Sequence, residues 1–133
     1  NKIIIMAIRN EQERLLTNIN TTQDNIVNVN NAAGGLDGNI LITGTTAATC
    51  AVSGKCFVTI QMLTDTVFNS SAGGLTPVTA QLYMGDTGTS TDIDANAGAA
   101  TDSVTFPAGT VIFGKWSSIT LASGSVVAYI GTE

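Results

Sequence analysis

Few side chains in this sequence could carry out chemistry. The chain has no histidine, which excludes Ser-His-Asp and Cys-His catalysis and the usual proton shuttle near neutral pH. Its ten carboxylates fall mostly in predicted turns, where aspartate forms local hydrogen bonds, and none lies amid a cluster of aromatic residues as in a glycoside hydrolase. We therefore expect a protein that is not an enzyme and needs no cofactor.

Two cysteines, Cys50 and Cys56, flank the sequence AVSGK. If Ser53 and Gly54 form a turn, the two cysteines face each other across a hairpin at a distance that suits a disulfide. Two thiolates are too few for a zinc site, and the CxxC redox spacing is absent. A disulfide formed in an oxidising medium and a pair of buried free thiols both fit the sequence.

An acidic loop begins in the manner of a calcium-binding loop, with Asp92, Asp94 and Asn96 at alternate positions. The match then fails, because Gly98 falls one place late and Ser103 stands where a bidentate glutamate is needed. We predict an ordinary exposed loop and no metal site, with a weak calcium site at these three residues as the alternative.

The charge and hydropathy of the chain exclude two classes of partner. Five basic residues against ten acidic ones give a net charge of −5, so no cationic surface could neutralise several phosphates of a nucleic acid. No apolar run approaches the ~20 residues that span a bilayer. Among the aromatic residues, most of which fit a protein core, Trp116 and Tyr83 are the candidates for a surface contact, for example with a glycan.

The element with the clearest pattern is the N-terminal arm, residues 1–31. Uncharged residues recur in it at alternating spacings of four and three, which is the pattern of a coiled-coil seam. The members of this seam are Ile8, Gln12, Leu15, Ile19, Thr22, Ile26 and Val29.

The arm is predicted to be helical from about residue 11, with Asn10 as N-cap and Glu13 reaching back to it. The preceding KIIIMAI segment resembles a strand, and an extended end of the arm, at NIVNVNN, is the alternative to helix there. The seam indicates either a helix that lies on its own domain or an oligomer. Isoleucine at the a positions 19 and 26, with polar Gln12 and Thr22 in the seam, favours a homotrimer.

The rest of the chain is predicted to be mainly β. A glycine-rich hinge at 32–38 is followed by seven or so short apolar runs between turn signals over 39–133. Runs of this length indicate an antiparallel β-sandwich or a jelly-roll-like domain. The final three are expected at 110–116, 117–122 and 125–130.

Three stretches, MAIRNEQERLLTNI, CAVSGKCFVTIQMLTDTVFNSS and FPAGTVIFGKWSSITLASGSVVAYIG, resemble small virion structural proteins of tailed bacteriophages, especially marine ones. The resemblance covers most of residues 6–131. It implies a capsid decoration (cement) protein or head fibre, trimeric, made in the host cytoplasm and located on the capsid surface. Its partners would then be copies of itself and the major capsid protein or another virion protein.

Two other functions fit the same sequence. The chain could be an extracellular filament subunit in which KIIIMAI adds as a strand to the sheet of the next subunit. It could also be a glycan-binding surface module that uses Trp116, Tyr83 and the acidic loop.

Overall fold

The computed structural model describes residues 1–70, 73–79, 82–86 and 98–133. Strand exceeds helix, at 37% against 23%, and the sheets are antiparallel with a helix before them, which confirms the expected fold class. The chain divides into two compact units, residues 1–31 and residues 32–133.

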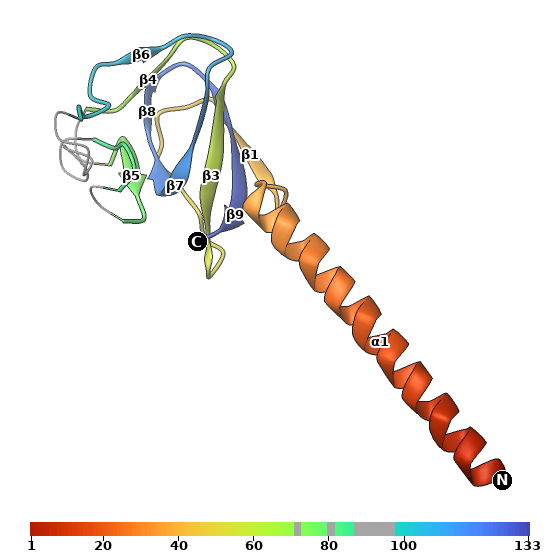
Figure 1. Cartoon of the computed structure of the whole chain (residues 1–133). Coiled ribbons are helices and arrows are strands. Elements are labelled where there is room, and N and C mark those ends of the chain that lie inside the picture. Colours follow the sequence, from red (N-terminus) through yellow and green to blue (C-terminus); the bar gives the residue numbers. More distant parts are fainter. Residues whose placement is uncertain (71–72, 80–81, 87–97) are drawn as a thin grey trace. The chain divides into compact units, whose positions relative to one another are not determined.

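The arm forms one helix, α1, from Lys2 to Ala33 (Figure 1). The predicted start near residue 11 was wrong, and so were the cap at Asn10 and the strand-like KIIIMAI. The isoleucines before residue 10 cost a helix only a few tenths of a kcal/mol each. Two of them, Ile5 and Ile8, also continue the heptad stripe toward the N-terminus, so the pattern that favours the helix does not stop at residue 11.

Polar residues inside α1 are satisfied locally. The hydroxyl groups of Thr17, Thr21 and Thr22 each donate a hydrogen bond to the carbonyl oxygen four residues earlier, at 2.9–3.0 Å. This back-bonding explains how threonine is tolerated in the middle of a helix. Arg14 pairs with Glu11 at 2.8 Å on the exposed surface.

In the described part of the chain, nine strands form two antiparallel sheets (Figure 1). The larger sheet contains β1 (Asn39–Ile42), β2 (Ala48–Thr49), β3 (Lys55–Met62), β5 (Leu75–Pro77), β7 (Val111–Ile119) and β9 (Val126–Thr132). The smaller sheet contains β4 (Thr66–Phe68), β6 (Thr105–Phe106) and β8 (Leu121–Ser123). The expected break between 116 and 117 is absent, because β7 runs unbroken through it.

The registers place β2 and β5 on opposite edges of β7, since both pair with Ser118 and Ile119. β5 also pairs with Trp116, and the other side of Trp116 is taken by Phe57 of β3. β5 therefore lies on the edge away from β3, and β2 continues the β3 edge. The larger sheet has β1 and β5 at its two sides, with β9, β3 and β7 between them.

One hydrophobic core joins the two sheets. Trp116, Phe57 and Ile60 contribute from the larger sheet, and Phe68 and Leu121 from the smaller one, all at most 1% exposed. Phe68 also packs edge-to-face on Phe106, with ring centroids 5.4 Å apart. Side chains of both sheets meeting in one core give the two-layer arrangement that the sequence predicts.

The glycine-rich hinge lies on the larger sheet. Gly35 is buried with φ +80°, and a Cβ at this position would lie 3.0 Å from Tyr129 Cβ and from Val58 Cγ2. The amide of Asp37 donates to the Ile130 carbonyl oxygen at 3.1 Å. The chain therefore enters the β unit along β9, through a contact that only glycine allows.

Candidate functional site

The apolar face of α1 is the strongest candidate for a functional surface. Ile8, Leu15, Ile19 and Ile26 of the predicted seam are each 53–55% exposed, and Gln12 and Thr22 are exposed as well. Val29 lies in the same helix, but its side chain is outside the described part of the structure. Exposed apolar residues in a continuous stripe indicate a surface that a partner covers.

The stripe contains a shallow, mostly apolar depression at its centre. It is lined by Leu15, Asn18, Ile19, Thr22 and Gln23. The first four are spaced i, i+3, i+4 and i+7, which is the set of four residues that forms a hole for a side chain of a facing helix in a coiled coil. Asn18 and Gln23 are absent from the predicted seam, although their heptad positions, g and e, could have been assigned from it.

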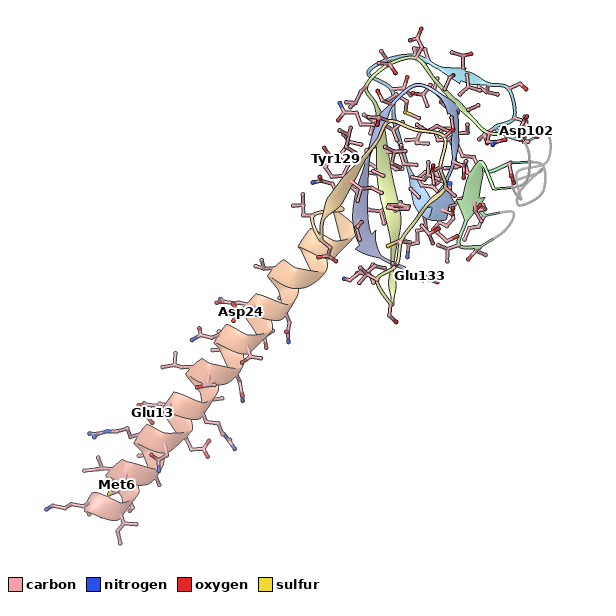
Figure 2. The ribbon with its side chains drawn as sticks, turned by 180° about the vertical axis from the view of Figure 1, so that it is seen from behind. Met6, Glu13, Asp24, Asp102, Tyr129 and Glu133 are labelled. Atoms are coloured by element: carbon pink, nitrogen blue, oxygen red, sulfur yellow. The ribbon has the colours of Figure 1, made fainter. Side chains whose placement is uncertain are left out.

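The electrostatics of α1 allow identical helices to lie side by side. Three basic residues balance three acidic ones in the helix, so its side chains carry no net charge. The g and e positions at the centre are the amides Asn18 and Gln23, which carry no charge and can hydrogen-bond across an interface. Figure 2 shows Glu13 and Asp24 along the helix, and both fall outside the seam positions.

Trp116 is a core residue and not a surface contact, which corrects the prediction. Its side chain is fully buried, and its indole N–H donates to the Met84 carbonyl oxygen at 2.8 Å. Gly114 lies under the ring, because a Cβ there would come within 2.7 Å of two ring carbons. Tyr83 is partly exposed, so the structure does not bring the two aromatic residues together as an open platform.

The two cysteines lie at the ends of one loop. The predicted turn at Ser53 and Gly54 is present, with Gly54 at φ +72°. The predicted hairpin is wrong, because β2 and β3 follow one another along the same edge of β7 and do not pair with each other. The backbone amide of Cys50 donates a hydrogen bond to the Ser117 carbonyl oxygen at 3.0 Å. Cys56 comes directly before Phe57, which pairs with Trp116 across β3 and β7.

Both cysteines are free thiols in this structure, and a disulfide in the oxidised protein stays a prediction. Cys56 is fully buried, and its thiol is 3.8 Å from the Thr132 carbonyl oxygen. Burial raises the pKa of this thiol above its ordinary value, and the nearby Glu133 and Cys50 act in the same direction while Lys115 opposes them. Cys56 therefore stays protonated and unreactive at neutral pH.

Among the described residues of the β unit, one carboxylate, that of Asp86, is buried. Asp86 accepts hydrogen bonds from the backbone amides of Gly73 and Gly74, the latter at 3.1 Å, and its own amide donates to Leu75. These contacts fix the turn that leads into β5. Both amides donate to the same carboxylate oxygen, Oδ2, so this oxygen is satisfied by the backbone of the loop.

The proposed calcium ligands Asp92, Asp94 and Asn96 lie outside the described residues. Within the described part, no group of three or more histidine, cysteine, aspartate or glutamate side chains could hold a metal ion. The described helix is also not apolar enough over a sufficient length to cross a membrane.

Comparison with protein-family models, with curated proteins and with solved structures finds no match for this chain.

Proposed function

We propose that this chain is a non-enzymatic structural protein of a phage virion that assembles as a homotrimer through α1. The observation that carries this proposal is the exposed heptad stripe of α1 with its knob-accepting depression. The β unit is then the part that each trimer presents on the capsid surface, as a decoration (cement) protein or head fibre. The virion assignment itself rests on the sequence resemblance.

The composition of α1 supports a partner for this helix. Seven asparagines and three threonines lie among its 32 residues, no acidic residue lies in the first turn, and no basic residue lies in the last. Such a sequence has low intrinsic propensity and leaves the helix dipole uncompensated. Since helices of this kind derive their stability from packing, burial of the stripe against other copies supplies what the sequence lacks.

The side chains in the stripe favour three copies over two. Leucine at d with a β-branched residue at a is typical of parallel dimers, whereas β-branched residues at both positions shift the preference to larger bundles. Here Ile19 and Ile26 occupy a positions, and three of the four d positions are also β-branched (Ile8, Thr22 and Val29), with Leu15 as the exception. Gln12 adds a polar residue inside the seam, which fixes the register of the helices.

The depression predicts which side chain enters it. In a parallel, in-register coiled coil, the side chain at an a position of one helix (the knob) packs into a hole on the neighbouring helix. Four residues of the neighbour form this hole: its equivalent a residue, the d and g residues just before it, and the d residue just after it. The hole formed by Leu15, Asn18, Ile19 and Thr22 then accepts Ile19 of the next copy. Each copy offers both the knob and the hole, so the same contact can repeat around a closed ring of three copies.

The virion part of the proposal is tested on phage particles. The chain should sediment with purified capsids, and the purified protein should bind again to particles from which it has been stripped. The variant Leu15→Asp/Ile19→Asp should lose this binding, because a monomer lacks the avidity of a trimer. Thr17→Asp/Asn20→Asp, which adds the same charges at the f and b positions, should bind as the wild type does.

A chain that never sediments with particles would contradict the virion assignment. Binding that is equally strong for the two double variants would show that particle attachment does not depend on the α1 oligomer. Of the alternative functions, filament assembly by strand addition is less favoured, because residues 2–8 are helical here. The glycan-binding alternative loses Trp116, which is buried, and keeps Tyr83 and the acidic loop as its candidate site.

A further inference from the structure

The outer face of the larger sheet is a second apolar surface. Ala128 and Ile60 point into the core, so alternation along each strand directs their neighbours to the opposite face. The register aligns these neighbours in two rows across β1, β9, β3 and β7. The first row is Asn39, Tyr129, Thr59 and Phe113, and the second is Leu41, Val127, Gln61 and Val111.

This outer face is unlike a solvated sheet face. Phe113 is 73% exposed, Leu41 63% and Val111 42%, and Val127 and Tyr129 lie between them, partly exposed. The outer face of an antiparallel sheet is ordinarily polar when water covers it. Five apolar or aromatic residues among eight, three of them prominently exposed, indicate a face that another protein surface covers.

The chain reaches this face within a few residues of the end of α1. Gly35, only two residues after the end of α1, packs on the same face at Tyr129, Val58 and Thr59. A β-bulge turns both Val58 and Thr59 outward, since the flanking Phe57 and Ile60 are both core residues. Each chain therefore enters its β unit at this outer face. If α1 holds the copies together, the short connection raises the local concentration of the outer faces of neighbouring copies.

Charge also favours another copy as the partner of this face. Residues 32–133 contain two lysines and seven carboxylates, a net charge of −5, so identical β units repel each other over most of their surfaces. The eight residues of the outer face carry no charge. Like-charged copies can therefore meet on this face without bringing carboxylates together.

We infer that the outer face of the larger sheet, centred on Phe113, Val111 and Leu41, is an interface between β units of copies joined through α1. This inference rests on the proposed self-association of α1. It adds that the β units pack on one another and do not hang separately from the helical bundle.

Hydroxyl-radical footprinting of the full-length protein tests this inference. Oxidation of Phe113 should be roughly five-fold or more slower in the wild-type oligomer than in the Leu15→Asp/Ile19→Asp monomer, since an interface removes most of a side chain's accessible surface. Leu82, which is 52% exposed and lies outside the two rows, serves as the internal control and should react equally in both. Wild-type protein diluted until it dissociates provides a monomer without substitutions.

Three other results would overturn the inference, and each identifies which step of it fails. An oligomer in which Phe113 reacts as fast as in the monomer would refute the interface and leave the α1 assembly intact. Protection of Phe113 that persists in the monomer would show that the chain covers this face itself. A wild-type protein that is monomeric at all concentrations would refute the α1 assembly and the inference together.

Discussion

At the scale of single residues, the core depends on a glycine that the sequence does not mark. Gly114 is one of 14 glycines and lies inside a strand, where glycine ordinarily weakens the structure. Its role becomes visible only when the indole of Trp116 is seen within 2.7 Å of the position of a Cβ. From the sequence, Trp116 was a candidate for a surface contact, because the chain contains no local signal for its contact with Gly114.

We predict that Gly114→Ala destabilises the β unit by about 1–3 kcal/mol, because a rigid buried ring cannot move aside for the added methyl group. Urea unfolding followed by tryptophan fluorescence measures the change. Gly44→Ala is the matched control, since nothing lies within 4 Å of a Cβ at that position. Equal stability of the two variants would contradict the packing described for Trp116.

Cys56 gives a prediction for the dependence of stability on pH. Because burial raises its pKa in the folded state, the stabilisation is fully present below the ordinary thiol pKa of 9.0 and is lost as the pH rises through the folded-state pKa. Under reducing conditions, thermal unfolding should therefore show a loss of stability above pH 9 that Cys56→Ala reduces. Cys50→Ala should keep most of the wild-type loss, because Cys50 makes the smallest contribution to the raised pKa of Cys56. A wild-type slope in Cys56→Ala would refute the assignment.

At the scale of elements, the sequence predicted the helical arm, its seam and the β-rich remainder. Periodicity carries this information because the stripe repeats over several turns and each strand is bounded by turn residues. The start of the helix was missed because a run of isoleucines resembles a strand when it is considered alone. The placement of β2 and β3 along the same edge of β7 was also missed. A turn at Ser53 and Gly54 suggests a hairpin, and only the pairing of both strands with β7 distinguishes the two arrangements.

For α1 we predict that Gln12→Ile stabilises the oligomer. A polar side chain in the seam fixes register at a cost in stability, so its replacement by a buried isoleucine should strengthen association by on the order of 1 kcal/mol per chain. The midpoint of the concentration-dependent helix signal in circular dichroism should move to lower protein concentration. Asn10→Ile, at the f position outside the seam, should leave that midpoint unchanged, and a shift as large as that of Gln12→Ile would contradict the seam.

At the scale of the whole molecule, the candidate site is an exposed stripe on one helix, for which we propose repeated contacts between copies of the chain. The stripe of α1 could be predicted from the sequence because its residues are neighbours along one helix. The outer face of the larger sheet could not, because Leu41, Val127, Gln61 and Val111 come together only through the pairing of four strands. Non-local pairings of this kind leave no mark at short range in the sequence.

The central claim is that α1 holds copies of this chain together, and sedimentation equilibrium of the full-length protein tests it most directly. The account predicts a mass of three times the 13.6 kDa of the chain for the wild type and for Thr17→Asp/Asn20→Asp. For Leu15→Asp/Ile19→Asp it predicts the mass of a single chain, with the β unit still folded. A wild-type protein that sediments as a single chain at every concentration, or a seam variant that keeps the wild-type mass, would contradict it.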